Sequence, residues 1–435
     1  ALNFIPVFGI IFYLLFGQDL KKSRMFKVKG ISDRLNMPVK SQEEIIRSSD
    51  IPEEMMDPLI RDFRSLILYN LETSGAVLTT DNQVKIYTDG QAKFEGLRTA
   101  LRRASRFIHI QYYIIKNDEV FDSIVPILED KVREGVEVRI LYDGMGGRFM
   151  PKRRWEELRR AGILVGVFFP PILGWLNLRV NYRNHRKIVV IDGNVGFVGG
   201  FNIGREYISK DPGFGYWRDT HLRITGEAVM SLQIRFALDW NYATGENLFK
   251  NEAYFRTDLK KKTDVRRDKE RPAWPDPELE GSQVGMQIIA SGPDTREPHI
   301  RNNYLELFHK AKHHIYIQTP YFVPDDAIFS ALKMAALSGV DVRLMIPCKP
   351  DHPFVYRATC SYAGELLDYG AKVYIYTNGF LHSKGIMVDG RVCCYGTANM
   401  DIRSFELNFE VNATIYDEAV TAELEQAFMN DLPHC

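Results

Sequence analysis

Short apolar runs alternate with amphipathic stretches along most of the chain. Four runs of strand length lie at 107–115, 136–143, 314–323 and 340–347. Stretches with apolar residues three and four apart lie before the first and third of these runs, at 94–104 and 304–311. Continuous or alternating apolar runs are typical of strands, and the wider spacing is typical of helices with one buried face. The alternation predicts an α/β protein with mixed or mostly parallel sheets.

The same succession of elements occurs twice. The helix that begins near residue 94 and the strands after it have counterparts from residue 304 onward. We therefore expect two pseudo-symmetric α/β/α domains, at 84–246 and 284–435. Residues 247–283 are dense in charge and proline and poor in apolar residues, which predicts a linker between the domains.

The start of the chain is almost wholly apolar. Residues 2–18 carry no charge, and at about 1.5 Å per residue a helix of this length barely crosses the hydrocarbon of a bilayer. We expect a membrane helix at 1–20, with further residues upstream because the first residue is Ala1 and not Met. The region 21–83 begins with a basic cluster and continues with helical periodicity. Positive residues beside a membrane helix stay cytoplasmic, so the two domains should face the cytoplasm.

Composition narrows the classes of function. Lys plus Arg and Asp plus Glu both number 56, so the chain lacks the basic excess of a dedicated nucleic-acid binder. The five Cys all lie after residue 347, and two of them, Cys393 and Cys394, are adjacent in an apolar run. This distribution suits neither a disulfide framework nor a zinc site, and it indicates small core residues in a reducing compartment.

A polar motif is repeated with identical spacing in the two halves. It consists of a His, a Lys, an Asp, a Gly and an Asn, at His185, Lys187, Asp192, Gly199 and Asn202 and again at His382, Lys384, Asp389, Gly396 and Asn399. Residues two apart on a strand share a face, so each His and Lys can meet one ligand together. A lone His is usually a hydrogen-bonded structural residue. Packing alone does not explain two copies that agree at five positions.

The residues of the paired motif suit phosphodiester exchange. That reaction needs a nucleophile, a proton donor for the leaving alkoxide, and positive groups around the phosphoryl oxygens. A neutral imidazole can attack phosphorus and a protonated one can donate, and His holds either form near neutral pH. Two His, two Lys and two Asn supply this set, and because both His would share one anion their titrations should be coupled.

The motif, HxKxxxxD followed by a small-residue segment ending in Asn, resembles the signature of the phospholipase D superfamily. The segments YRNHRKIVVIDG, GGFNIGREY, QTPYFVPDD and GTANMDIRSFELNFEV are similar to those of the bacterial cardiolipin synthases within it. The resemblance implies two phospholipase D-like domains behind a membrane helix. It also implies a covalent phosphatidyl-histidine intermediate and a reaction that uses no metal and no cofactor.

The resemblance also assigns roles to the residues of the motif. His185 would be the nucleophile and His382 the acid and then the base, with the reverse order as the alternative. Lys187 and Lys384 would hold the phosphate, with amide hydrogen bonds from Asn202 and Asn399. An acidic residue past each motif would orient the His of that motif, and the matching positions are Asp219 and Glu410. Asp192 and Asp389 are expected to be structural, closing turns at strand ends.

The predicted function is that of a membrane phosphatidyltransferase. It would pass the phosphatidyl group of one phosphatidylglycerol to a second, releasing glycerol and forming cardiolipin at the bacterial cytoplasmic membrane. The alternatives are a phospholipase D or phosphodiesterase with water as acceptor, a membrane-tethered nuclease, and an inactive lipid-binding scaffold. The neutral charge balance speaks against a nucleic-acid partner, and the sequence carries no signal for an oligomeric state.

One apolar segment is present in the first half only. About eleven extra residues precede the first motif and fall in 168–180, shortly after a basic run at 148–160. Aromatic side chains favour the membrane interface and basic ones favour anionic lipids. We expect Phe169 and Trp175 to contact the membrane or acyl chains, with a loop packed on the core as the alternative.

Overall fold

The computed structural model describes residues 57–170, 181–255 and 283–435. The predicted membrane helix, Trp175 and most of the predicted linker lie outside these ranges. Within them, no helix combines the length and the apolar character needed to cross a bilayer.

The first half is built from strands that carry helices on their outer face. Its strands are β1 (Thr79–Tyr87), β2 (Phe107–Tyr112), β3 (Glu137–Asp143), β4 (Leu164–Phe168), β5 (Arg183–Asn184), β6 (Ile188–Ile191), β7 (Val195–Gly199), β8 (Trp217–Arg218) and β9 (His221–Thr225). Its helices are α6 (Gly90–Arg102), α7 (Glu119–Asp122), α8 (Val125–Arg133), α9 (Lys152–Arg160) and α10 (Ala228–Thr244), with 3₁₀ turns η2 (Gly146–Phe149), η3 (Arg205–Ile208), η4 (Leu248–Lys250) and η5 (Glu252–Phe255).

The second half repeats this plan. Its strands are β10 (Val284–Ser291), β11 (His314–Gln318), β12 (Phe322–Val323), β13 (Asp341–Pro347), β14 (Lys372–Tyr376), β15 (Phe380–Leu381), β16 (Gly385–Val388), β17 (Val392–Gly396), β18 (Met400–Asp401) and β19 (Asn408–Tyr416). Its helices are α11 (His299–Lys310), α12 (Asp326–Leu337), α13 (Pro353–Leu367), α14 (Ile402–Glu406) and α15 (Glu418–Asp431), followed by η8 (Leu432–His434). Two helices precede the first half, α4 (Pro58–Asp62) and α5 (Arg64–Ser74).

Strand order shows the internal symmetry of the molecule. One half runs β4-β3-β2-β6-β7-β9-β1 and the other β14-β13-β11-β16-β17-β19-β10, and β1 pairs antiparallel with β10 so that a single sheet passes through both halves. The three outer strands of each half are parallel and the others antiparallel. The sheets are therefore mixed, within the range that the sequence predicts.

Acidic N-caps fix where several helices begin. Asp89, Asp325 and Asp417 each accept a hydrogen bond from the backbone N–H three residues later, at the starts of α6, α12 and α15. These side chains satisfy a donor that has no partner inside the helix.

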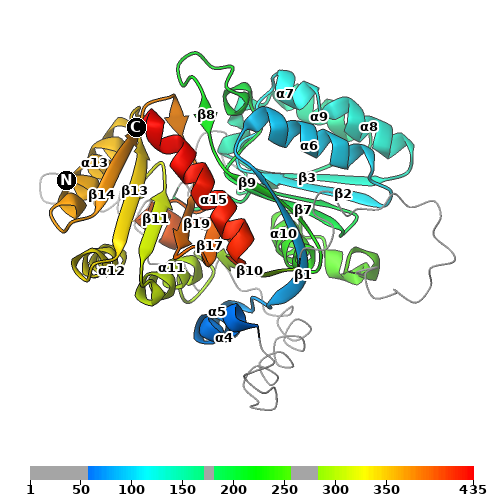
Figure 1. Cartoon of the computed structure of the whole chain (residues 1–435). Coiled ribbons are helices and arrows are strands. Elements are labelled where there is room, and N and C mark those ends of the chain that lie inside the picture. The colour runs from blue at the N-terminus through cyan, green and yellow to red at the C-terminus, as the bar shows by residue number, and fades with distance from the viewer. Residues whose placement is uncertain (1–56, 171–180, 256–282) are drawn as a thin grey trace, which may run out of the picture.

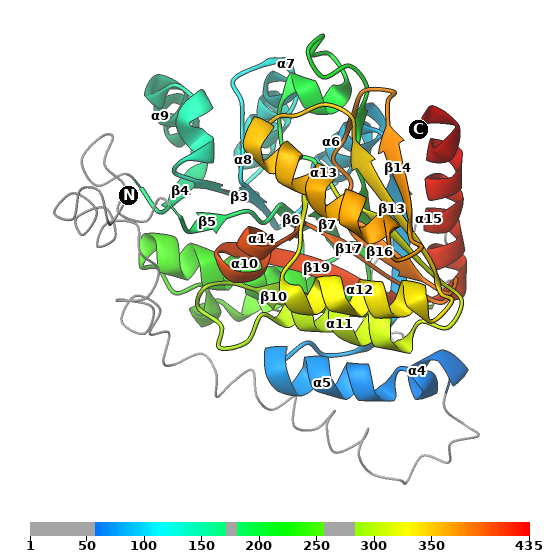
Figure 2. The ribbon, with the colours of Figure 1, turned by 90° about the vertical axis from the view of Figure 1, so that its left-hand side faces the viewer.

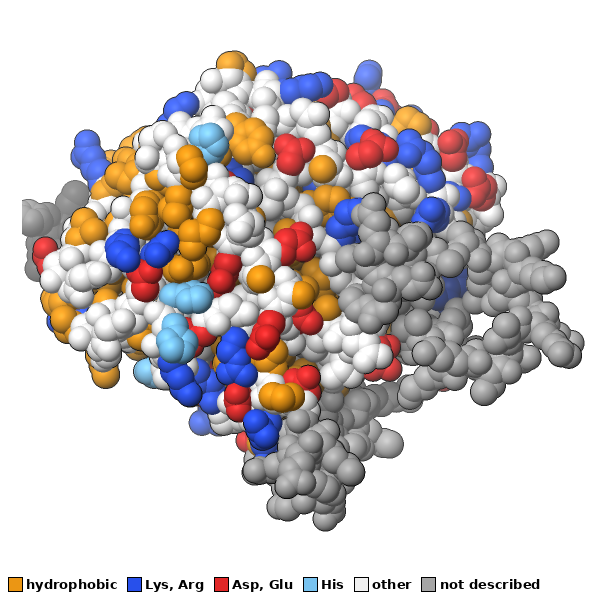
Figure 3. Space-filling view, viewed as in Figure 1, with side chains coloured by type: hydrophobic (Ala, Val, Ile, Leu, Met, Phe, Trp, Pro, Cys, Tyr) orange, Lys and Arg blue, Asp and Glu red, His pale blue; other side chains and the backbone are white. Residues whose placement is uncertain are grey.

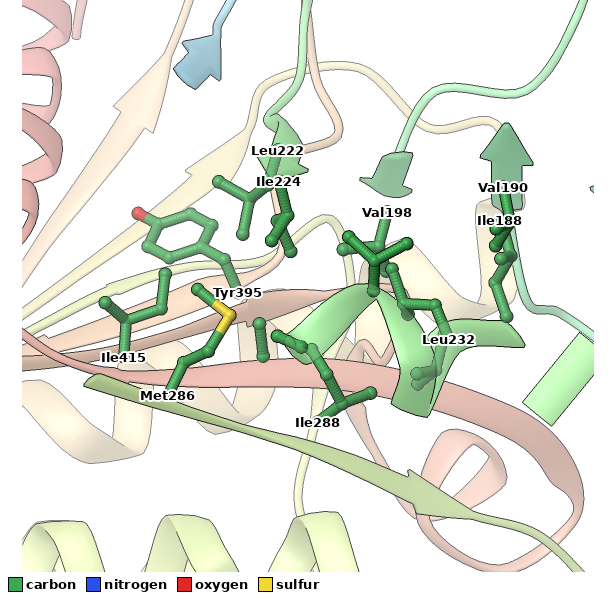
Figure 4. Close-up of a cluster of buried hydrophobic side chains, with 14 of the residues drawn as sticks. Ile188, Val190, Val198, Leu222, Ile224, Leu232, Met286, Ile288, Tyr395 and Ile415 are labelled. Atoms are coloured by element: carbon green, nitrogen blue, oxygen red, sulfur yellow. The ribbon is translucent and has the colours of Figure 1, made fainter. Parts of the chain in front are cut away.

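The hydrophobic core has three parts. A central cluster lies between the two halves and includes α10, α15 and the inner faces of β6, β9 and β19; Figure 4 shows Ile188, Leu222, Met286 and Ile415 converging there. Outer clusters lie under α6, α8 and α9 in one half and under α11, α12 and α13 in the other (Figure 1). The adjacent Cys393 and Cys394 are both buried, one in the central cluster and the other in an outer one.

Helix α5 is fastened to the second half, although it precedes the first in sequence. It packs against α11 and β10, as Figure 2 shows. The amide of Asn70 donates to Asn303 Oδ1 at 2.9 Å and lies 3.2 Å from Gln287 Oε1, all within the core. On the face that carries α15, apolar and charged side chains of both signs are interspersed (Figure 3), consistent with the zero net charge of the chain.

Candidate active site

Two short strand pairs bring the repeated motifs together. Strand β5 pairs in parallel with the start of β19, and β15 pairs in parallel with β8. The short strand that precedes each motif therefore pairs with a strand of the opposite half. The pairing continues into the motifs. His185 N–H donates to the Phe409 carbonyl at 3.0 Å, and His382 N–H donates to the Arg218 carbonyl at 2.7 Å. The backbone of each catalytic candidate is thus fixed by the other half.

The orienting carboxylates are exchanged between the halves. His185 Nδ1 lies 2.9 Å from Glu410 Oε1, and His382 Nδ1 lies 2.6 Å from Asp219 Oδ2. The expectation that each acid orients the His of its own motif is therefore wrong. The cause is the strand pairing, since β19 delivers Glu410 beside β5, and β8 delivers Asp219 beside β15.

Both carboxylates are fully buried and hydrogen-bonded. Glu410 accepts from Thr397 Oγ1 at 2.6 Å, and Asp219 accepts from the Thr220 N–H at 2.8 Å. Burial would raise their pKa values, but the positive groups around them outweigh it and hold both pKa values below the ordinary carboxyl range: Lys384 and His382 for Asp219, and His185 and Lys187 for Glu410. Each imidazole therefore faces a carboxylate anion on Nδ1, which leaves Nε2 for a substrate.

The small residues of the motifs make room for these carboxylates. A Cβ added to Gly200 would lie 1.9 Å from Asp219 Oδ1, so only glycine fits there. The corresponding position in the second half is Thr397, whose hydroxyl binds Glu410. These residues therefore make room for, or bind, the acid that orients the imidazole.

Burial also shifts the pKa values of the two imidazoles. It lowers the pKa of His185, against the opposing effect of Glu410. It lowers the pKa of His382 to about 4, with the charge of Lys384 acting in the same direction and Asp219 opposing both. Without an anion in the site, His382 is accordingly neutral at physiological pH. A bound phosphodiester would stabilise its protonated form.

The two lysines lie beside the imidazoles that they accompany in sequence. Lys187 Nζ donates to the His185 carbonyl at 2.6 Å, and Lys384 Nζ donates to the His382 carbonyl and lies 2.8 Å from His382 Nδ1. Burial lowers the pKa of Lys187 to about 7 and that of Lys384 to about 8, while the site carboxylates oppose the shift. A buried ammonium poised near neutrality gains most from an anionic ligand.

The two motif asparagines differ in their surroundings. Both polar atoms of the Asn202 amide are hydrogen-bonded. Its Oδ1 accepts from the Ile114 N–H at 3.1 Å, and its Nδ2 donates to Tyr207 Oη at 3.0 Å. Asn399 is 4% exposed, and its Oδ1 has no hydrogen-bond partner. This oxygen is an acceptor and suits a hydroxyl donor, so binding of a phosphate oxygen by Asn399 would use its Nδ2–H group.

Asp192 and Asp389 hold the turns that follow β6 and β16. Both have φ of 55°, and both accept hydrogen bonds from consecutive backbone N–H groups at the start of a neighbouring strand. Asp192 binds the N–H groups of Ser105, Arg106 and Phe107, and Asp389 binds those of Lys312, His313 and His314. These contacts support the structural role that the sequence predicts for them.

A cavity of about 420 Å³ opens beside His185. It is lined by Tyr113, Arg183, His185, Tyr321, Val323, His352, Val355, Asn399, Asp401, Ile402, Arg403, Leu407 and Asn408. His185 and Asn399 were predicted from the repeated motif, and most of the other lining residues fall in the segments that carry the family resemblance, although no role was predicted for them. No sequence signal marked Tyr113, His352 and Val355, which lie in the segments after β2 and β13.

Phe169 does not take the place expected of a membrane contact. Its side chain is 2% exposed and belongs to the central core cluster, with its ring centroid 5.9 Å from that of Phe409. The alternative of packing on the core therefore holds for this residue. Trp175 lies outside the described residues.

Within the described ranges, no group of three or more His, Cys, Asp or Glu has the arrangement of a metal site.

Comparisons with known proteins show the family and the fold of the chain. A family model described as "Cardiolipin synthase, PLD-like domain" matches residues 97–214 and 304–432. The chain is 45% identical over 435 residues to a cardiolipin synthase of Listeria innocua, covering 99% of this chain and 86% of that protein. It is 48% identical over 434 residues to a cardiolipin synthase of Staphylococcus aureus, covering 99% and 83%. A solved phosphatidylserine synthase from Haemophilus influenzae shares the fold, with a TM-score of 0.60 at 16% identity over 86% of this chain and 91% of that one.

Proposed function

The chain belongs to the cardiolipin synthase family of phospholipase D-type phosphatidyltransferases, and from this premise we propose how its paired motifs carry out transfer between two phosphatidylglycerol molecules. The observation that supports the proposal most directly is the crosswise arrangement of two His–carboxylate pairs with a buried lysine beside each. One phosphoryl group held between them would have a nucleophile on one side and a proton donor on the other.

In the first step, Nε2 of His185 attacks phosphorus as the bond to the glycerol oxygen breaks. Glu410 keeps the Nδ1–H of that imidazole oriented and stabilises the positive charge that develops. His382, protonated while the phosphate anion is bound, gives its proton to the leaving glycerol oxygen. The product is a phosphatidyl group bonded to His185, with free glycerol. Lys187 and Lys384 would neutralise the non-bridging oxygens, and the Nδ2–H group of Asn399 would donate to one of them.

In the second step, the terminal hydroxyl of another phosphatidylglycerol enters where glycerol left. His382 takes the hydroxyl proton as oxygen bonds to phosphorus, and the bond from phosphorus to His185 breaks. Cardiolipin forms and both imidazoles return to their starting states. We place the two domains on the cytoplasmic side of the bacterial membrane, a location supported by the basic residues that follow the apolar start of the chain.

The reverse order of the two His has one specific observation in its favour. The pKa of His382 is lowered to about 4, and the neutral imidazole is the nucleophilic form. Trapping the covalent phosphoryl-enzyme by rapid acid-free denaturation and locating it by peptide mass spectrometry separates the two assignments. Phosphorylation at His185 supports the order given above, and phosphorylation at His382 inverts it without changing the reaction class.

The acceptor alcohol is tested by product analysis. The full chain is incubated with phosphatidylglycerol vesicles and the lipids are measured by mass spectrometry. Cardiolipin and glycerol in equal amounts are expected. Phosphatidic acid as the main product would mean that water is the acceptor and would reduce the function to that of a phospholipase D.

A further inference from the structure

The cavity beside His185 is lined by both polar and apolar side chains. The polar ones include Arg183, Asn399 and Asn408, and the apolar ones are Val323, Val355, Ile402 and Leu407. Such a mixed lining suits a phospholipid, which joins a charged phosphate to apolar acyl chains.

Exposed apolar side chains lie on two of the elements that line this cavity. Phe354, at the start of α13, is 85% exposed, although His352 and Val355 on either side of it line the cavity. Ile402, at the start of α14, lines the cavity and is 45% exposed. Figure 2 shows α13 and α14 on the same side of the molecule. Single exposed apolar residues are common on proteins, but here two of them lie on separate elements at one opening.

Each of these apolar residues has an exposed arginine close to it. Arg357 lies one helical turn after Phe354, and Arg403 follows Ile402 and lines the cavity. The acidic groups nearby are Asp351, which accepts a hydrogen bond from the Tyr321 hydroxyl, the buried Asp401, which lines the cavity and accepts from the Ser404 N–H, and the exposed Glu406. Apolar side chains next to arginines are the combination that binds an anionic bilayer surface, because the apolar groups enter the acyl boundary while guanidinium groups meet phosphates.

We propose that Phe354, Arg357, Ile402 and Arg403 form a bilayer-docking surface around the opening of the cavity, with anionic phospholipid as the partner. The proposal rests on the proposed function, since a transferase for phospholipids must reach a phosphate whose acyl chains stay in the membrane. Docking at this opening lets the phosphate reach His185 through the cavity while the acyl chains remain among lipid. The cavity is then the route of the lipid between membrane and imidazole.

The first test measures contact with the bilayer independently of catalysis. Phe354→Trp and, as a matched control, Leu367→Trp are made in the full chain; Leu367 is 49% exposed and lies at the other end of α13, about 20 Å away at 1.5 Å per residue. Both variants are reconstituted in vesicles of phosphatidylserine and brominated phosphatidylcholine, whose bromine atoms quench nearby tryptophan fluorescence. Phe354→Trp is expected to add a quenched component over the wild-type signal, and Leu367→Trp is not. Equal added quenching in the two variants, or none in Phe354→Trp, overturns the proposal.

The second test separates docking from chemistry. Phe354→Ser combined with Arg357→Gln is compared with Met334→Ser combined with Leu337→Ser, two exposed apolar residues on α12 that are 62% and 64% exposed. Turnover is measured on phosphatidylglycerol in vesicles and in an excess of detergent micelles. The first double variant should lose about tenfold on vesicles and little on micelles, and the control should lose little on either. Equal losses on both lipid forms, or equal losses in both variants, contradict a docking role.

The two tests also distinguish this proposal from the proposed function. If no cardiolipin is formed but the quenching is specific to Phe354→Trp, the docking surface stands and the reaction is reassigned. If cardiolipin is formed and the quenching is absent, the reaction stands and the bilayer is met by another face.

Discussion

Replacing Glu410 by Gln tests the crosswise pairing on which the proposed chemistry depends. In the structure both carboxylate oxygens of Glu410 lie within 3.0 Å of His185 Nδ1, and Thr397 Oγ1 donates to Oε2 at 2.6 Å. A glutamine has the same shape but offers one acceptor and one donor. If its oxygen keeps the bond from the Thr397 hydroxyl, its NH₂ group faces His185 Nδ1. The imidazole must then carry its proton on Nε2, the nitrogen that should attack phosphorus.

The expected size of the effect follows from these contacts. Loss of a hydrogen bond to a charged group contributes about 1.5–3 kcal/mol. Holding the imidazole in the wrong tautomer adds to this, for a total of about 3–5 kcal/mol, which corresponds to a rate loss of about 10²- to 10⁴-fold. The fold should be less affected than the rate, because the side-chain volume and the contact with Thr397 are retained.

The assay uses two substrates that differ in their need for an acid. Phosphatidylglycerol has a poor leaving group that must be protonated, whereas phosphatidyl-p-nitrophenol releases a stable phenolate without help. Glu410→Gln, which disables the nucleophile, should be slow in the first step with both. Asp219→Asn, which acts on the acid His382, should be slow with phosphatidylglycerol but close to wild type in the p-nitrophenol burst. Glu406→Gln, at an exposed position on α14, is the control for the substitution itself.

Two other results of the p-nitrophenol assay would contradict the crosswise pairing or the assigned roles. If the p-nitrophenol burst survives in Glu410→Gln and is lost in Asp219→Asn, then either the carboxylates serve the His of their own half or the two His have exchanged roles, and the trapped intermediate decides between these. A burst that is normal in both variants would show that neither carboxylate orients a nucleophile, and the reasoning from the contacts would be refuted.

Four further results are expected. His185→Ala and His382→Ala should each abolish transfer of phosphatidylglycerol with the melting temperature unchanged, and turnover near the wild-type rate in either would remove the mechanism. Asp192→Asn should lower the melting temperature by a few degrees with kcat retained, since it weakens hydrogen bonds worth about 1–3 kcal/mol; a loss of kcat at constant stability would contradict a structural role. Phe169→Ala should destabilise the protein by about 3–5 kcal/mol in denaturant titrations, whereas a surface residue would cost almost nothing. Lys187, with a pKa of about 7, is charged below that pH and neutral above it, so KM for phosphatidylglycerol should rise as the pH increases beyond about 7, and Lys187→Arg should flatten the profile.

The repeated motif and the alternation of strands and helices allowed much of the molecule to be predicted. Both features depend on residues that are close in sequence. The apolar runs of β6 and β16 are each contained in one strand, and His185 and Lys187 share a face because side chains two residues apart on a strand point the same way. The turns held by Asp192 and Asp389 follow from the same local pattern. The prediction succeeded where a residue's neighbours in sequence decide its place.

The partners of the two imidazoles could not be predicted in this way. Glu410 is 225 residues from His185, and their contact depends on the parallel pairing of β5 with β19. Nothing in a two-residue strand specifies its partner. The continuous sheet through β1 and β10 is hidden for the same reason, since the edge strand of a half shows no sign of the strand that will cover it. Phe169 was misplaced because an apolar loop residue is equally compatible with lipid and with a protein core.

The exchange of strands between the halves sets the moment at which a newly made chain becomes reactive. Synthesis produces His185, Lys187 and Asp219 early, but His185 has no carboxylate until Glu410 has emerged and β19 has joined the sheet near the end of the chain. A nascent or truncated chain that stops before residue 408 therefore holds no complete His–acid pair for His185. Such a chain lacks the acid that orients its proposed nucleophile, so by the reasoning given for Glu410→Gln its transfer rate should be at least about 10²-fold below that of the complete chain.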